Sequence, residues 1–312
     1  MKNCKIFICF QIENKLFIYT TCAIIFVIGS EQEEIKMNKM KKFMSAALVA
    51  ALSATMVMGC GSKPAEKAEK EVENDVVEET EETTILVAAA ASLQYSYDEE
   101  LIPMFEAANP GIKVEATYDS SGKLQTQIEE GMEADVFMAA AMKQMNALVE
   151  EEYIADEDVV KLLENEVVLI TAADADLGMT EFTDILKANT IAIGDPESVP
   201  VGQYAQDSFT NLGIWDDVLA KASLGTNVTE VLNWVAEGSA ESGVVYATDA
   251  ATTDKVKVIA KAPAESLTKK AIYPVAALKD SANKEAADKF VEFLTSEDAV
   301  KVFEKYGFIE NK

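Results

Sequence analysis

The chain has 312 residues, with 54 acidic side chains against 27 basic ones, and it contains no histidine. A formal charge of −27 argues against a nucleic-acid partner, because binding to a phosphate backbone needs a basic surface, and general acid–base catalysis by histidine is excluded. All four cysteines lie at or before Cys60, so the remaining sequence offers neither a disulfide nor a thiolate metal site.

Residues 40–59 have the pattern of a secretory signal peptide, with lysines at the start, an apolar run and small residues before a cysteine. The ending Val-Met-Gly-Cys resembles a bacterial lipoprotein signal. We therefore expect Cys60 to carry lipid and to anchor the protein to the cell membrane, on its extracytoplasmic face. The alternative is a membrane helix, but the run is interrupted by Ser and Thr and is shorter than the roughly 20 apolar residues that span a bilayer.

Two further N-terminal segments are distinct in composition. Residues 1–39 contain a second apolar run at 16–29, and we interpret them as an upstream extension, with Met37 or Met40 as the real start. A short membrane helix is the alternative. Residues 60–83 are rich in Glu and free of aromatics, a composition that predicts a disordered acidic tether, since it cannot bury enough apolar surface to offset ordering.

From residue 84 onward, segments typical of strands and of helices alternate. Apolar runs predict strands at 84–89, 112–117, 135–139, 167–171, 190–193 and 243–247. Helical spacing of apolar residues predicts helices at 93–105, 124–130, 142–149, 204–212, 228–235 and within 284–307. This alternation predicts an α/β protein with mostly parallel sheets, and the length of the region favours two lobes.

Two details of the helices lead to specific expectations. Pro103 should kink or break the first helix, because proline lacks an amide hydrogen and clashes with the preceding turn. Phe290, Phe293 and Phe303 are expected to anchor the C-terminal helices in the core.

Short loops lead into predicted helices at four places, and free amide groups at a helix start can hold an anion. The first two junctions end in Ser92 and in the Ser120-Ser121-Gly122 run. The third is 194–205, where Pro200 has no donor and the amides of residues 201–203 should be free. Asn227-Val228 forms the fourth. Each signal alone is weak, because Ser and Asn are also ordinary helix caps.

A tyrosine, Tyr246, follows an apolar strand near the same set of junctions. It is an ordinary core residue or, if it faces a cleft, a neutral donor. Taken together, the junctions predict a site in which helix starts and neutral hydroxyls surround a dehydrated oxyanion without a basic side chain.

The order of these motifs resembles the periplasmic molybdate-binding proteins of ABC importers. The resemblance covers residues 84–310 and rests on seven motifs in this order, Ala-Ala-Ala-Ser-Leu, Ser-Ser-Gly-Lys-Leu, Glu-Ala-Asp-Val-Phe, Gly-Asp-Pro-Glu-Ser-Val-Pro-Val-Gly-Gln-Tyr-Ala, Gly-Val-Val-Tyr-Ala-Thr-Asp-Ala, Tyr-Pro-Val-Ala and Lys-Tyr-Gly-Phe. It implies a two-lobed periplasmic-binding-protein fold of type II with two crossover strands. Lobe I would comprise 84–165 with 272–312, and lobe II 166–271.

The resemblance also implies the site and its ligand. Ser92 and Ser121 would each supply a hydroxyl and an amide, Val201 and Val228 an amide only, and Tyr246 its phenol. Molybdenum or tungsten would be bound only as molybdate or tungstate, with no cofactor. Gly122 stands where relatives often have a third hydroxyl residue. The partners implied are the oxyanion and a membrane permease, and we expect a monomer.

Three alternatives remain open at this level: another anionic ligand, an enzymatic activity and capture of a metal ion. The ligand could be another anion, such as sulfate, thiosulfate or an organic anion. A protonated anion such as monohydrogen phosphate would need a carboxylate acceptor, for which Asp119 and Asp195 are the candidates. An enzyme would have to pair Asp195 with Glu197 or Asp249, although we expect no enzymatic activity. The acidic surface could also capture a metal ion.

Overall fold

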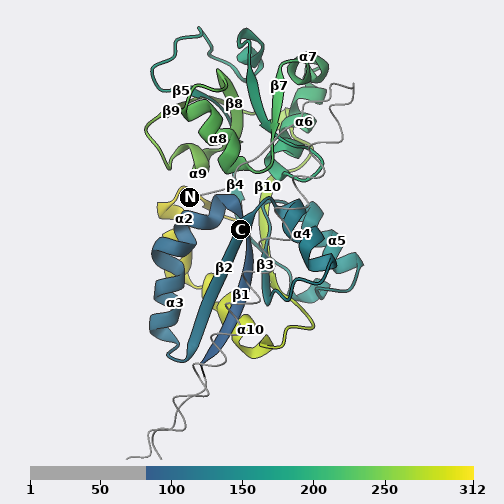
Figure 1. Ribbon diagram of the computed structural model, residues 1–312, viewed down its shortest axis with the longest axis vertical. Coiled ribbons are helices and arrows are strands. Elements are labelled where there is room, and N and C mark those ends of the chain that lie inside the picture. The colour runs from purple at the N-terminus through teal and green to yellow at the C-terminus, as the bar shows by residue number, and fades with distance from the viewer. Residues whose placement is uncertain (1–81) are drawn as a thin grey trace, which may run out of the picture. The chain divides into compact units, whose positions relative to one another are not determined.

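The computed structural model describes residues 82–312 (Figure 1). The predictions for residues 1–39, for the signal peptide at 40–59, for lipid on Cys60 and for the tether up to residue 81 lie outside the described residues. The first strand, β1 (Thr83–Ala90), begins at the last residue assigned to the tether, and Thr83 pairs with Ile112. Among residues 82–312, no helix combines the length and the hydropathy needed to cross a membrane.

The first sheet has six strands in the order β11-β4-β10-β3-β1-β2. Besides β1, its strands are β2 (Ile112–Asp119), β3 (Val136–Met138), β4 (Val160–Asn165), β10 (Ala271–Ala277) and β11 (Ile309–Glu310). The helices of this lobe are α3 (Ile102–Ala108), α4 (Ser121–Glu129), α5 (Met142–Glu150), α10 (Lys284–Leu294) and α11 (Glu297–Lys305).

The second sheet has five strands in the order β7-β6-β8-β5-β9. Its strands are β5 (Val167–Ala172), β6 (Ile191–Gly194), β7 (Ala222–Gly225), β8 (Ser242–Tyr246) and β9 (Val256–Lys261). Its helices are α6 (Pro200–Asn211), α7 (Trp215–Leu219), α8 (Val228–Ala236) and α9 (Ala247–Ala250). The two sheets confirm an α/β protein with two lobes.

The prediction that each sheet is mostly parallel was wrong. β1 pairs in parallel with β2 and β3, and β6 with β7 and β8, but β10 runs antiparallel to β3 and β4, and β5 runs antiparallel to β8 and β9. Both sheets are therefore mixed. Each antiparallel pair includes β4, β5 or β10, strands that lie next to the two points, β4–β5 and β9–β10, where the chain passes from one sheet to the other. Apolar periodicity carries no information about strand direction, so the sequence pattern could not predict these pairs.

Pro103 does not break the first helix. The chain coils continuously from residue 91 to residue 108, and a π-helical segment, η2 (Tyr97–Leu101), lies directly before α3, which has the proline in its first turn. A wider turn suits a proline, because the carbonyl oxygens of the preceding turn need not approach the ring. The apolar stripe predicted along this helix is fully buried, at Leu93, Tyr97, Leu101 and Phe105.

The C-terminal helices are anchored by two of the three predicted phenylalanines. Phe290 and Phe303 are fully buried, and the Phe290 ring meets that of Phe105 edge-on, with ring centroids 4.9 Å apart. Phe293 is only half-buried and packs at the edge of the core.

Candidate anion-binding site

All five residues predicted to bind the ligand line one small cavity, where the ends of the parallel strands lead into helix starts. The cavity is lined by Ser92, Ser121, Val201, Val228 and Tyr246, together with Ala90, Ala91, Asp119, Ser120, Ala140, Val199 and Pro200. It is narrow, with a cavity volume of about 10 Å³, about the space that one water molecule needs. A four-oxygen anion would require its walls to separate slightly.

Four main-chain amides of the lining residues are free. The amides of Ser92, Ser121, Val201 and Val228 have no hydrogen-bond partner within residues 82–312. Ser121 and Val228 are the first residues of α4 and α8, and Val201 follows Pro200 at the start of α6. Helix starts leave such donors unpaired, and the helix dipole favours a negative charge in front of them.

One expected donor is not available. The amide of Gln203 donates to the carbonyl of Val199 at 3.1 Å, so the prediction that it stays free was wrong. This is the first helical hydrogen bond of α6, since the donor in an α-helix lies four residues after its acceptor. Gly202 lies tight against β6, since a Cβ there would come within 2.0 Å of the Gly194 carbonyl oxygen.

The two serine hydroxyls are held in different ways. The Oγ of Ser121 accepts a hydrogen bond from the amide of Ala140 at 3.0 Å. Because that amide can only donate, the proton of the Ser121 hydroxyl is available for another acceptor. The Oγ of Ser92 lies 2.9 Å from the phenol oxygen of Tyr273, a residue that the sequence motifs included only as part of Tyr-Pro-Val-Ala.

Tyr246 ends β8 and is almost fully buried. Burial raises the pKa of its phenol well above the usual range, so the group is a neutral donor. In this structure the phenol donates to the carbonyl of Ala140 at 3.2 Å. The main chain of Ala140 therefore contacts Ser121 of its own lobe through the amide and Tyr246 of the other lobe through the carbonyl. Tyr246 would have to leave this carbonyl to reach an anion.

Gly122 has a role that the sequence analysis missed. Its amide donates to the carbonyl of Ser198 in the other lobe at 2.9 Å, and a Cβ at Gly122 would lie 2.4 Å from that same oxygen. Only glycine permits this approach. The position therefore lacks a hydroxyl but allows close contact between the lobes.

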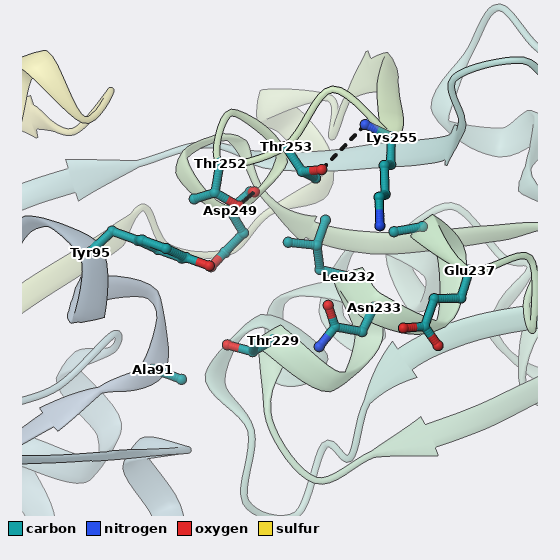
Figure 2. A pocket seen from close by; sticks show the side chains of 11 residues that line it. Ala91, Tyr95, Thr229, Leu232, Asn233, Glu237, Asp249, Thr252, Thr253 and Lys255 are labelled. Carbon is teal, nitrogen blue, oxygen red and sulfur yellow. Dashed lines mark hydrogen bonds between the residues drawn. The ribbon is translucent and has the colours of Figure 1, made fainter.

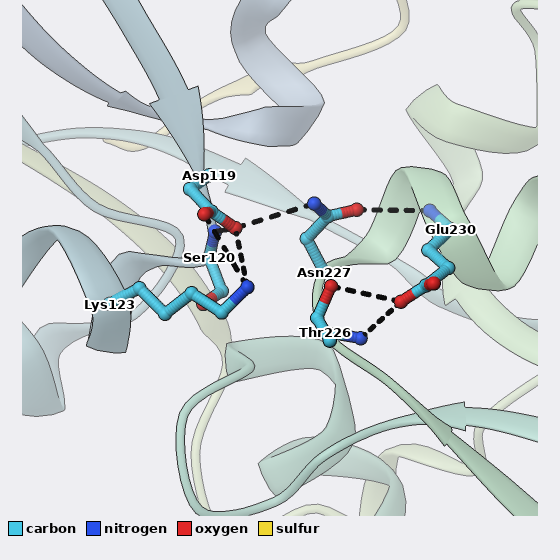
Figure 3. Close-up of polar contacts among 6 residues, drawn as sticks. All are labelled: Asp119, Ser120, Lys123, Thr226, Asn227 and Glu230. Carbon is cyan, nitrogen blue, oxygen red and sulfur yellow. Dashed lines mark hydrogen bonds and ion pairs between the residues drawn. The ribbon is translucent and has the colours of Figure 1, made fainter. Parts of the chain in front are cut away.

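The carboxylate of Asp119, at the cavity edge, is already engaged by three donors (Figure 3). Its Oδ1 accepts from the amide of Ser120 at 2.7 Å, from Lys123 at 3.3 Å and, across the lobes, from Asn227 Nδ2 at 3.3 Å. Asn227 is also the cap of α8, since its Oδ1 accepts from the amide of Glu230 at 2.9 Å. The sequence predicted the cap but not the bond to Asp119.

The other acidic candidates do not line this cavity. The Oδ1 of Asp195 accepts from the amide of Glu197 at 3.0 Å, within its own loop. Asp249 lines a separate, larger cavity with Tyr95, Asn233 and Lys255 (Figure 2). Among residues 82–312, no group of three or more His, Cys, Asp or Glu side chains is arranged to hold a metal ion.

Asp249 nonetheless accepts a hydrogen bond from a residue that lines the anion cavity. Its Oδ2 accepts from the amide of Tyr246 at 3.2 Å, at the start of α9. Burial raises the pKa of the Asp249 carboxyl to about 7, only partly opposed by hydrogen bonds from the amides of Tyr246 and Asp249.

Comparison with known proteins places the chain among extracellular transport proteins. It is 38% identical over 262 residues to the "Putative ABC transporter substrate-binding lipoprotein YvgL" of Bacillus subtilis. The match covers 83% of this chain and 96% of the relative. It is 35% identical to the molybdate-binding protein ModA of Haemophilus influenzae over 72% of this chain and 89% of the relative.

A solved structure shares both the fold and much of the sequence. The "substrate binding domain of putative molybdenum ABC transporter from Clostridium difficile" is 36% identical, with a TM-score of 0.58, and the match covers 74% of this chain and all of that one. The family described as bacterial extracellular solute-binding protein matches residues 85–309. The chain therefore belongs to the bacterial extracellular solute-binding proteins, with molybdate-binding proteins among its relatives.

Proposed function

We propose that this protein captures molybdate, and also tungstate, outside the cytoplasm and delivers the anion to an ABC permease. The observation that carries the proposal is the set of donors around one cavity: four unpaired amides and the hydroxyl of Ser121, whose proton is free to face an acceptor. No lysine lines this cavity among the described residues. Helix starts and neutral donors stabilise an anion without a counter-charge.

The same donors favour an anion that carries no proton. Molybdate and tungstate are fully deprotonated at neutral pH, whereas monohydrogen phosphate would need an acceptor for its proton. The nearest carboxylate, Asp119, is engaged by Ser120, Lys123 and Asn227. The names of the relatives support molybdate over other deprotonated anions such as sulfate or thiosulfate.

In the proposed complex, Ser92 and Ser121 each donate a hydroxyl and an amide, Val201 and Val228 each donate an amide, and Tyr246 turns its phenol from Ala140 to the anion. The lobes separate to admit the anion and then close around it, a common mechanism in two-lobed binding proteins. The protein acts as a lipid-anchored monomer with no enzymatic activity. The lipid lies on Cys60, and the lobes divide at 84–165 with 272–312 and at 166–271.

The test is calorimetric titration of the purified protein with molybdate, tungstate, sulfate, thiosulfate and phosphate, paired with thermal melts. We expect heat and a raised melting temperature with molybdate and tungstate, since a ligand that binds only the native state stabilises it. Neither heat nor a thermal shift with these two anions, alongside tight binding of sulfate, would overturn the proposal. Loss of binding on chelation of divalent cations would instead indicate metal capture.

A further inference from the structure

A chain of hydrogen bonds leads from the point where the backbone leaves the first sheet to the hydroxyl of Ser92. The amide of Glu166 donates to Oδ1 of Asn165 at 2.8 Å. The Nδ2 of Asn165 then donates to the phenol oxygen of Tyr273 at 3.2 Å, and that oxygen lies 2.9 Å from Oγ of Ser92. Asn165 is the last residue of β4, and Tyr273 lies on β10.

The direction of every bond in this chain follows from its first member. A main-chain amide can only donate, so the atom of Asn165 that faces Glu166 must be the carbonyl oxygen. The other end of the side chain is then the NH₂ group, which also donates to Oγ1 of Thr248 at 2.8 Å. An NH₂ group accepts nothing, so the oxygen of Tyr273 must be the acceptor in its bond with Asn165.

The single proton of Tyr273 therefore has to go elsewhere. Tyr273 is fully buried, and burial raises the pKa of its phenol well above the usual range, so the proton stays on the oxygen. Among the hydrogen bonds of the described residues, Ser92 is the remaining partner of that oxygen. Ser92 thus accepts, and its own proton is left to point toward the cavity that it lines.

We propose that Tyr273 is a positioning residue for the anion site, which together with Asn165 turns the hydroxyl of Ser92 into an obligate donor. The inference rests on the proposed function, since it assumes an oxyanion in this cavity. The hydroxyl of Ser121 is also left to donate, because its oxygen accepts directly from the amide of Ala140. A side chain thus does for Ser92 what the main chain does for Ser121.

The test is a double-mutant cycle on molybdate affinity, measured by calorimetry with the purified protein. Tyr273→Phe removes the hydroxyl but keeps the ring, which packs against Tyr246 and Phe308 at centroid distances of 5.5 and 5.3 Å. We expect the dissociation constant to rise about tenfold, because Ser92 can then turn its proton away. In a Ser92→Ala background, the same change should cost less than about twofold, since no hydroxyl remains to be oriented.

Two further variants complete the design. Tyr204→Phe is the matched control, because its hydroxyl donates to the carbonyl of Lys270 at 3.2 Å and does not line the cavity; it should bind normally. Asn165→Ala removes the donor to Tyr273 and should also lose affinity, again only when Ser92 is present. It replaces Tyr273→Phe in the cycle if that variant fails to fold.

The outcomes separate the two proposals. If the unaltered protein binds neither molybdate nor tungstate, the proposed function fails. If it binds but Tyr273→Phe leaves the affinity unchanged, or lowers it equally with and without the Ser92 hydroxyl, the positioning role is overturned while the function stands.

Discussion

The two walls of the cavity offer donors in different ways. On the first lobe, the side chains of Ser92 and Ser121 contribute hydroxyls whose oxygens already contact Tyr273 and the amide of Ala140. On the second lobe, Val201 and Val228 bury their side chains and turn only their amides to the cavity. Substitution of the two serines should therefore alter the first wall, whereas at Val201 and Val228 only changes in the backbone should affect binding.

The largest effect should come from removing both serine hydroxyls on the first wall. Ser92→Ala combined with Ser121→Ala should weaken molybdate binding about a hundredfold to ten-thousandfold, because a hydrogen bond to a charged group contributes about 1.5–3 kcal/mol. Calorimetry measures the change, and Ser223→Ala, at an exposed position on β7, is the control. An unchanged affinity would place the anion elsewhere.

The second wall carries a buried acid whose effect should appear in stability. The carboxyl of Asp249 has a pKa of about 7 in the folded protein against an ordinary value of 3.8. Between about pH 4 and pH 7 the unfolded chain loses this proton while the folded chain keeps it, so stability should fall as pH rises through that window and then level off.

Asp249→Asn should remove this pH dependence and stabilise the protein at neutral pH by at most about 4 kcal/mol. The amide oxygen of the new side chain can still accept from Tyr246. Thermal melts from pH 4 to pH 8 measure the effect, with the exposed Asp254→Asn as the control. Parallel pH profiles for Asp249→Asn and the unaltered protein would show that Asp249 is ionised in the fold.

A backbone change should break the second wall where a side-chain change does not. Val228→Pro removes one amide hydrogen at the first position of α8, where proline is well tolerated, and Asn227 before it is already extended, with φ −157° and ψ 174°. Affinity should fall about tenfold to a hundredfold. Val228→Ala, which keeps the amide, should bind within about twofold of normal. Equal affinities for both variants would exclude this amide from the site.

The smallest effect should arise where the walls meet. Gly122→Ala places a methyl group against Ser198 and removes one neutral hydrogen bond between the lobes, so affinity should fall about threefold to tenfold. Melting of the ligand-free protein should hardly change, because the lobes can stay apart. Gln127→Ala, on an exposed face of α4, is the control. Normal binding by Gly122→Ala would mean that this contact is not needed in the complex.

Strands with strong apolar character could be predicted, and weaker ones could not. β1, β5 and β8 are apolar and largely buried along their length, and each was found within one or two residues. β7 (Ala222–Gly225) and β9 (Val256–Lys261) were missed, because β7 has only four residues and half of the residues of β9 are exposed. Their pairing with β6 and β5, and not their own sequence, makes them strands.

The sequence by itself determined the local chemistry of the site. Small residues after apolar strands, Pro200 at a helix start and Asn227 as a cap are recognisable because capping involves only neighbours in the chain. Tertiary structure alone decided the bonds of Ser92 with Tyr273, of Gly122 with Ser198 and of Asp119 with Asn227. These partners are 76 to 181 residues apart. The order of strands in the first sheet brings Tyr273 to Ser92, and the approach of the two lobes brings the other two pairs into contact.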